Sequence, residues 1–317
     1  MMSETNAAES RAWLLIDASQ EGVLRFATAL PSASPRIDQV REIDVRQMPS
    51  FTDALQQFER DSGCELRGVT CAMVIAGAPT GETLSLVRSR WTITRSGLAA
   101  VLGGAITIIN DVAARAWAIR AGTGKIDTVR GVGTLNLGRG GRYAMIMVEE
   151  GLGAAAIDVD AHGLMRILES EAGHTDFAPS SEREEKLARA LKGAAPFVSW
   201  ERMLTIPRHD PLWAQACPEM TEAERSQLLA ALLGRFAVNL MHSFGAWQGV
   251  MIAGDHARQI LDSGGRPAFD SAFAARRHFS RLISGTTVWR VDQRDAVLNG
   301  AAQRLAQDMY PERKPAA

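Results

Sequence analysis

The chain has 317 residues, a formal net charge of −1 and 46% hydrophobic residues. This length is enough for one large domain or two medium domains with hydrophobic cores. The near-zero charge provides no long-range field for nucleic acid or an anionic membrane, so we expect neither as a partner. No apolar run approaches the roughly 20 residues that a membrane-spanning helix needs.

The cysteines and the first residues indicate a cellular compartment. Cys64, Cys71 and Cys217 are odd in number and lack the spacing of metal ligands, so they read as buried or incidental thiols in a reducing environment. Residues 1–11 are polar and lack the basic and apolar regions of a signal peptide. We therefore expect a soluble cytoplasmic protein.

The first third of the chain alternates between apolar runs typical of buried strands and apolar residues at helical spacing. Turn-forming residues at 78–81 interrupt this pattern after a long apolar run. We predict a strand over 12–17 with its hairpin partner over 23–30, a helix over 51–58, a central strand over 68–77, short strand or loop segments over 84–87 and 91–94, and a helix over 96–102 that stops at Gly103 and Gly104.

The next stretch combines a strand pattern with candidate chemistry. Residues 106–109 are apolar and mostly β-branched, and they are followed by Asn110, Asp111 and an alanine-rich helical segment over 112–120. Ligands of α/β sheets bind just beyond the carboxyl ends of the strands. The Asp111 carboxylate therefore suits a general base that removes a proton from a substrate hydroxyl. From these residues alone, the alternative is that Asp111 only caps the following helix.

The second part of the chain restarts the same kind of pattern. Like the first part, it opens with a strand, a short polar turn and a return strand, and it later contains an apolar strand that ends in glycine. The sequence thus predicts two α/β halves with a hinge near Asp111. We predict strands over 143–148 and 154–159, an amphipathic helix over 181–192, a long helix over 221–247, strands over 249–254 and 287–291, and a closing helix over 295–309 with Asp295 as its N-cap.

The most specific stretch is residues 171–179, Glu-Ala-Gly-His-Thr-Asp-Phe-Ala-Pro. By itself, the spacing of its Glu and His fits a metal half-site or a structured loop. The stretch closely resembles the G-E-x-G-H-x-D-F-A-P signature of bacterial glucokinases, members of the actin-like sugar-kinase superfamily. Residues 109–111 resemble that family's I-N-D-F, residues 198–204 resemble V-S-x-E-R-V-L, and residues 251–254 resemble F-I-A-G-G. The likeness extends at low density from Trp13 to the last helix.

The resemblance implies a fold and an assembly. The fold class is α/β, a two-domain actin-like ATPase (ribonuclease H-like) sugar-kinase fold in which each domain is a mixed sheet flanked by helices. The implied small domain covers residues 12–111 and is completed by the C-terminal helix over 295–311, and the large domain covers 112–294. Since the family tends to form homodimers, the resemblance also implies a homodimer.

The resemblance further implies a hexose site. Hydroxyls of a sugar both donate and accept hydrogen bonds, and carboxylates, an amide and an imidazole can answer them. Asp111 would take the proton from the attacking 6-hydroxyl, as the bases of kinases do. Trp91 matches a family tryptophan, but Arg88 stands where an asparagine is expected, so a sugar other than glucose also fits. The implied sugar-binding residues are Asn110, Asp111, Glu171, His174 and Glu201.

The nucleotide motifs of the family are altered. Its first phosphate loop, D-x-G-G-T-N, keeps only the acid in residues 17–22, and its second, G-T-G-L-G, reads Glu-Glu-Gly-Leu-Gly at residues 149–153. The adenosine motif A-G-G becomes Ala-Gly-Asp at residues 253–255. We expect no dedicated metal site, apart from Mg²⁺ held with ATP through the first acid. The implied nucleotide-binding residues are Asp17, Gly151, Gly153 and Gly254.

These departures matter because glycine lets backbone N–H groups approach a phosphate closely. Glu149 and Glu150 instead put two negative charges where phosphates should rest. Two like charges about 4 Å apart cost roughly 4 kcal/mol at an effective dielectric constant near 20, although Mg²⁺ could be bridged by such acids.

The sequence therefore leaves three interpretations. The first is an ATP-dependent hexose kinase that closes its domains over glucose or a similar sugar, with Mg-ATP as donor. The second is a non-catalytic hexose-binding sensor or regulator of the same fold. The third, a structural protein without a small ligand, ranks last because Glu171 and His174 would then lack a role.

Overall fold

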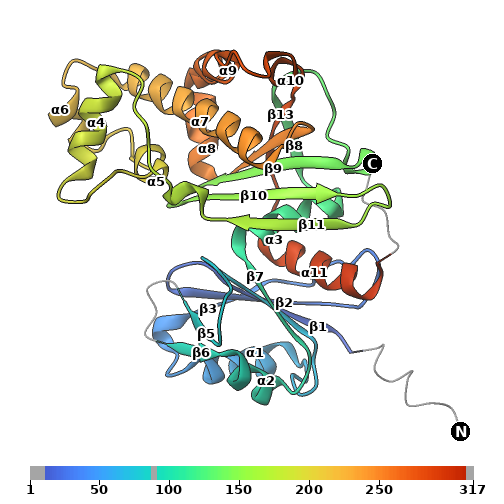
Figure 1. The fold of residues 1–317 in the computed structure, drawn as a ribbon. Helices are drawn as coiled ribbons and strands as arrows, with labels where there is room; N and C mark the ends of the chain where they lie inside the picture. Colours follow the sequence, from blue (N-terminus) through green and yellow to red (C-terminus); the bar gives the residue numbers. More distant parts are fainter. Residues whose placement is uncertain (1–10, 87–90, 312–317) are drawn as a thin grey trace, which may run out of the picture. The chain divides into compact units, whose positions relative to one another are not determined.

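The computed structural model describes residues 11–86 and 91–311, and it divides the chain into two compact units (Figure 1). Each unit is built around its own sheet, with helices packed against it. Unit 1 extends to Thr123 and also takes His162–Ile167 and the C-terminal segment from Gln293, whereas unit 2 consists of Gly124–Ala161 and Leu168–Asp292.

The described part of unit 1 contains a five-stranded mixed sheet in the order β3-β2-β1-β4-β7. β1 pairs antiparallel with β2 and parallel with β4, and β4 pairs parallel with β7. The carboxyl ends of β1, β4 and β7 therefore meet at one edge of the sheet. The strands are β1 (Trp13–Ala18), β2 (Val23–Ala29), β3 (Arg41–Asp44), β4 (Cys71–Ile75) and β7 (Ile106–Asn110).

Helices pack on the sheet of unit 1 because its strands present apolar side chains. Leu14 and Ile16 of β1 share a core with residues of α1 and α2, while α11 packs against β1, β4 and α3. α11 approaches α3 so closely that a Cβ on Gly300 would lie 1.7 Å from the carbonyl oxygen of Ala114. The helices are α1 (Phe51–Ser62), α2 (Arg95–Leu102), α3 (Asp111–Ala118) and α11 (Ala296–Met309), and a small hairpin is formed by β5 (Thr83–Ser85) and β6 (Thr92–Thr94).

The described part of unit 2 contains a six-stranded mixed sheet in the order β11-β10-β9-β12-β13-β8. β9 pairs antiparallel with its hairpin partner β10 and parallel with β12, just as β1 lies between β2 and β4. The two units therefore repeat one topology. The strands are β8 (Lys125–Arg130), β9 (Gly141–Val148), β10 (Leu152–Val159), β11 (Met165–Ser170), β12 (Gly249–Ala253) and β13 (Val288–Asp292).

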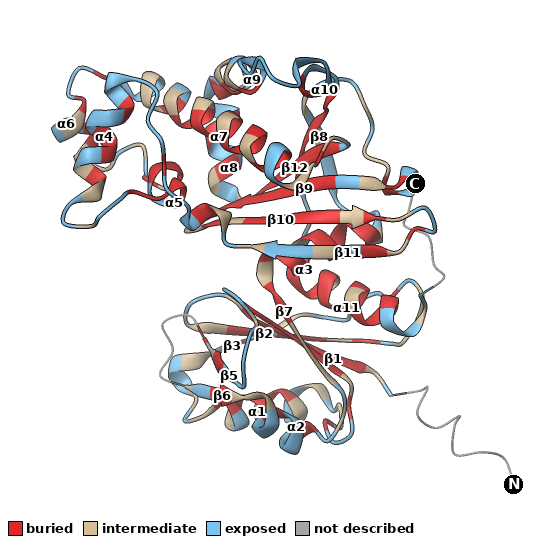
Figure 2. Ribbon diagram, in the orientation of Figure 1, coloured by how far each residue is buried: buried red, intermediate tan, exposed pale blue. Residues whose placement is uncertain are grey.

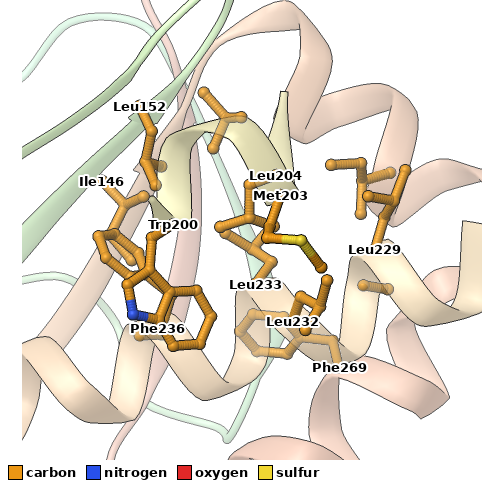
Figure 3. Close-up of a cluster of buried hydrophobic side chains, with 14 of the residues drawn as sticks. Ile146, Leu152, Trp200, Met203, Leu204, Leu229, Leu232, Leu233, Phe236 and Phe269 are labelled. Atoms are coloured by element: carbon orange, nitrogen blue, oxygen red, sulfur yellow. The ribbon is translucent and has the colours of Figure 1, made fainter. Parts of the chain in front are cut away.

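The long helix α7 anchors the core of unit 2. It begins with a capping box between Thr221 and Glu224 and ends at Gly245, whose left-handed backbone stops the helix before the predicted end at residue 247. Figure 2 shows the buried stripe of α7, and Figure 3 shows its side chains packed around Trp200 and Leu204. The other helices of unit 2 are α4 (Glu182–Lys192), α5 (Trp200–Leu204), α6 (Pro211–Ala216), α8 (Asp255–Ile260), α9 (Arg266–Ala274) and α10 (Ser280–Gly285).

The predicted strands and helices are confirmed as elements, and three strands were missed, β3, β8 and β11. β3 lies at an edge of the sheet of unit 1, and Ile43 is its only buried residue. β8 and β11 lie at the two edges of the sheet of unit 2, and most of their residues are exposed or partly exposed. None of the three has the continuous apolar run that marks the central strands β9 and β12, so the local pattern there does not predict a strand. Within the part of the chain that the structure describes, no helix is both long and apolar enough to cross a membrane.

Candidate functional site

In unit 1, Asn110 and Asp111 stand where β7 ends and α3 begins. The Asn110 side-chain oxygen accepts hydrogen bonds from the backbone N–H groups of Val112 and Ala113, at 2.8 and 3.1 Å. Its amide nitrogen donates to the carbonyl oxygen of Gly77, at 3.0 Å, beyond the end of β4. Asn110 is therefore the N-cap of α3, and the interpretation of Asp111 as only a cap is wrong.

Asp111 has a carboxyl group of unusual basicity. Burial raises its pKa to about 6, an effect that the nearby Asp17 charge adds to and that the Val112 N–H and the Arg115 guanidinium partly offset. Such a group is mostly ionised near neutral pH, yet it is basic enough to accept a proton. Its position and its pKa both suit a general base.

Asp17, at the carboxyl end of β1, is fully buried and already has partners. Its Oδ1 accepts hydrogen bonds from the backbone N–H and the hydroxyl of Ser19, at 3.0 and 2.6 Å. Its Oδ2 lies 3.6 Å from Nη1 of Arg25, the residue directly opposite it on β2. Arg25 also pairs with Glu42, at 3.1 Å, and with Asp295. Ser19 and Arg25 were not predicted as site residues, and the only pattern that pointed to them was the predicted hairpin.

Asp295 occupies the N-cap position of α11, but its side chain makes no capping hydrogen bond. Its carboxylate instead binds Arg25, and its backbone takes a left-handed conformation with a φ of 51°. The prediction that Asp295 is the N-cap of the closing helix is confirmed for its position, while the ion pair with Arg25 takes its carboxylate.

In unit 2 the fold brings Glu171, His174 and Glu201 together. The Nε2 atom of His174 lies 3.6 Å from Oε2 of Glu171, and its Nδ1 atom lies 3.6 Å from Oε1 of Glu201. These distances exceed those of hydrogen bonds, so the three side chains keep hydrogen-bonding capacity for a ligand. The side chains of His174 and Glu171 are about 60% and 56% exposed, so no core packing accounts for the cluster.

Backbone contacts hold this cluster in place. Glu171 and His174 flank a 3₁₀ turn that packs on β10, where a Cβ on Gly173 would lie 2.1 Å from the carbonyl oxygen of Leu152. Glu201 lies in the first turn of α5, and its Oε2 accepts a hydrogen bond from the Leu152 N–H at 3.0 Å. The Trp200 N–H donates to the carbonyl oxygen of Thr175 at 3.1 Å, which joins the two segments.

The predicted phosphate residues of unit 2 surround the turn between β9 and β10. This turn is formed by Glu149, Glu150 and Gly151, and a Cβ on Gly151 would lie 3.2 Å from Oε2 of Glu201. The turn is therefore next to the Glu171–His174–Glu201 cluster. Gly153 lies in β10 opposite Met147 of β9.

Gly254 follows β12 with a φ of 102°, and a Cβ there would lie 2.3 Å from the carbonyl oxygen of Val148, at the end of β9. Only glycine fits such a close approach in this backbone conformation. Gly254 thus keeps the end of β12 next to the turn that carries Glu149.

The described residues include no group of three His, Cys, Asp or Glu side chains that could hold a metal ion. Asp17, the expected contact for Mg²⁺, has its Oδ1 bound by Ser19, while its Oδ2 is buried near Arg25 without a hydrogen bond. Trp91 makes an edge contact with Phe51, with ring centroids 6.3 Å apart, and Arg88 lies outside the described residues.

Solved structures of the same architecture show the fold. The chain is similar to a glucokinase from an Antarctic psychrotroph, with 20% identity, a TM-score of 0.73 and coverage of 93% of this chain and 98% of that chain. It is also similar to a glucokinase from Balamuthia mandrillaris in complex with glucose, with 17% identity, a TM-score of 0.72 and coverage of 94% of both chains. These likenesses confirm the two-domain actin-like sugar-kinase fold.

Sequence comparison then defines the family. The family model Glucokinase matches residues 23–207 and 212–308. A glucokinase from Stenotrophomonas maltophilia (strain R551-3) is 29% identical over 312 residues, which cover 89% of this chain and 91% of the relative. A glucokinase from Xylella fastidiosa (strain 9a5c) is 28% identical over 323 residues, with 90% and 93% covered. The chain belongs to the glucokinase family.

Proposed function

We propose that this protein is a hexose kinase that transfers the γ-phosphoryl group of ATP to the 6-hydroxyl of glucose or a similar sugar. The observation that carries the proposal is the cluster in which His174 lies 3.6 Å from both Glu171 and Glu201. Three exposed or partly exposed polar groups from two chain segments converge there without serving the core. A polyol can satisfy all of them, because each hydroxyl both donates and accepts.

The proposed chemistry assigns one proton transfer to Asp111. The sugar hydroxyl oxygen bonds to the γ-phosphorus, the bond from that phosphorus to its bridging oxygen breaks, and ADP leaves. Asp111 accepts the proton of the attacking hydroxyl, which its raised pKa of about 6 favours. Asn110, Glu171, His174 and Glu201 bind and orient the sugar. ATP arrives with Mg²⁺ as the second substrate, near Gly151, Gly153 and Gly254.

A second candidate function is a hexose-binding sensor without turnover. The β9–β10 turn carries Glu149 and the exposed Glu150, which oppose a triphosphate. In unit 1, Asp17 is fully buried and its Oδ2 lies 3.6 Å from Arg25, a cation that competes with Mg²⁺ for this carboxylate. In this case hexose binding persists and phosphoryl transfer is lost.

One calorimetric experiment separates the two candidates. Glucose is titrated into protein that already holds Mg-ATP, and we expect a sustained heat rate after each injection, which reports turnover. A saturating isotherm without sustained heat supports the sensor. No heat at all contradicts glucose as the ligand of both candidates.

A matched pair of histidine variants tests the site itself. His174→Ala should weaken glucose binding at least tenfold, since the ligand loses a partner between two carboxylates. His278→Ala, which changes an exposed histidine of the same unit, should leave binding unchanged.

We also expect a homodimer, which light scattering after size-exclusion chromatography tests directly.

A further inference from the structure

Arg235, in the middle of α7, contacts the segment that follows His174. Its Nη2 atom donates to the carbonyl oxygen of Ala178 at 2.7 Å, and its Nη1 atom donates to the hydroxyl of Ser180 at 2.8 Å. Nη1 also lies 2.5 Å from Oε2 of Glu184, whose side chain is 8% exposed against 15% for Arg235. One guanidinium therefore binds a loop, a serine and a buried carboxylate.

Glu184 holds the same serine from the other side. Its Oε2 accepts a hydrogen bond from the Ser180 N–H at 2.7 Å, and its Oε1 accepts one from the Ser180 hydroxyl at 3.1 Å. Arg235 and Glu184 thus fix both the backbone and the side chain of Ser180. Removing one partner of such a buried pair leaves the other charge without compensation, which is costly.

Aromatic contacts extend this arrangement to Glu201. The guanidinium of Arg235 lies 5.5 Å from the ring centroid of Phe177 and 5.6 Å from that of Trp200. The two rings meet edge to face at 4.8 Å, and Trp200 also packs on Phe236 of α7 at 5.4 Å (Figure 3). Trp200 directly precedes Glu201 in the chain. Fixing the indole of Trp200 therefore also fixes the backbone from which the Glu201 side chain extends.

We propose that Arg235 is the positioning residue of the sugar-binding half of unit 2. It ties the segment after His174 to α7 and to Trp200, and it thereby holds His174 between Glu171 and Glu201. Arg235 acts through its neighbours and does not touch the sugar. This inference rests on the proposed hexose-binding function.

The contacts need the particular shape of arginine. A planar guanidinium donates in several directions and stacks on rings at the same time, whereas a lysine ammonium is a compact charge without a planar face. Arg235→Lys can keep the ion pair with Glu184 but loses the paired contacts to Ala178 and the rings. Arg235→Met loses both the charge and the hydrogen bonds.

The first arm of the test measures glucose affinity by calorimetry. We expect Arg235→Met to weaken binding on the order of tenfold or more, because small displacements of binding groups have large effects. Arg235→Lys should recover part of that loss. The matched control is Arg225→Met, on the same helix, where Arg225 donates to the carbonyl oxygen of Arg208 at 3.3 Å and lies over Trp213, outside the cluster. The control should stay within about twofold of the parent.

The second arm measures amide hydrogen exchange without sugar. The N–H groups of Trp200 and Phe177 donate to the carbonyl oxygens of Thr175 and Val198, at 3.1 and 2.8 Å. In Arg235→Met both should exchange at least tenfold faster, while amides in the middle of α7 keep their protection. A merely structural effect would accelerate both regions together.

The two arms distinguish failure of the positioning role from failure of the proposed function. Unchanged exchange at Trp200 and Phe177 in a folded Arg235→Met variant overturns the positioning role. Parent protein that binds no glucose overturns the hexose function, and the exchange arm then still decides the role of Arg235. If Arg235→Met does not fold, Arg235→Lys takes its place: selective loss of protection at the two amides supports the role, and its absence contradicts it.

Discussion

The β1–β2 turn and the β9–β10 turn occupy the same place in two units of the same topology, yet they treat their acids differently. Just before the first turn, at the end of β1, Asp17 is fully buried beside Ser19 and Arg25. In the second turn Glu150 is exposed, and the neighbouring Gly151 faces the carboxylate of Glu201. The acid before the first turn lies buried beside a guanidinium, whereas the second turn places an exposed acid near the candidate sugar site.

This difference indicates what each turn can do. A carboxylate that is paired with a guanidinium has a fixed position and attracts a cation from solution only weakly. A turn with exposed acids repels a phosphate unless cations accompany it. The topology thus supplies two equivalent places at strand ends, and local residues decide which ligand each place accepts.

The largest expected effect concerns the strand-end acid of unit 1. Asp111→Asn should lower turnover by about 10²–10⁴, because a positioned general base contributes that factor. Glucose affinity should change only a few-fold, since asparagine still offers an amide oxygen. Initial rates and calorimetry measure the two quantities. Asp53→Asn, a change of the first-turn acid of α1 in the same unit, serves as the control and should leave turnover unchanged. A rate within tenfold of the parent would remove Asp111 from the base role.

The next effect concerns the buried acid before the first turn. Arg25→Met should lower the free energy of unfolding by about 3 kcal/mol, because it leaves buried Asp17 without its cation. Denaturant unfolding measures this loss. The double variant Arg25→Met/Asp17→Asn should recover part of it. Arg46→Met, which removes an exposed partner of Asp44 in the same unit, should change stability little. Equal losses in Arg25→Met and Arg46→Met would contradict the view that Asp17 depends on its cation.

The pH dependence of turnover should follow Asp111. Because burial raises its pKa to about 6, the base is protonated below that pH, and turnover should fall about tenfold for each pH unit further down. A pH–rate profile over about pH 5 to 8, which brackets this pKa, should show the change. A profile that is flat through pH 6 would argue against Asp111 as the titrating base.

The same group links stability to pH. The folded state holds the Asp111 proton up to about pH 6, whereas the unfolded chain releases it near the ordinary value of 3.8. The folded state therefore binds more protons between these values, and this group makes the protein less stable as pH rises through that window. Asp111→Asn should remove this contribution, which thermal unfolding at several pH values can measure.

The smallest expected effect concerns the acidic turn of unit 2. Glu149→Gly/Glu150→Thr should raise turnover or lower the KM for ATP a few-fold, because it removes two charges near the expected phosphates. Glu182→Gln/Glu185→Gln removes two charges from the exposed side of α4 and should change neither constant. A folded turn variant with the same turnover and the same KM for ATP as the parent would show that these acids do not limit nucleotide use.

Local patterns were sufficient for most of the architecture. The apolar runs of β1, β4, β7, β9 and β12 predicted central strands of both sheets. Ser50 and Thr221 cap the helices that begin directly after them, so these helix starts depend on neighbouring residues alone. The signature around Glu171 and His174 predicted a binding cluster, and the structure brings both residues next to Glu201. Their roles in sugar binding remain a prediction.

What the sequence by itself determined is therefore the central strands, the long helices, the two α/β halves and the family, because each depends on neighbouring residues or on a motif of fixed spacing. The tertiary structure decided the partners. It assigned the cap of α3 to Asn110 instead of Asp111, paired the carboxylate of the N-cap residue Asp295 with Arg25, and placed Arg235 against the loop after His174. These contacts join residues far apart in the chain, and no local pattern encodes which strand or helix will lie opposite another.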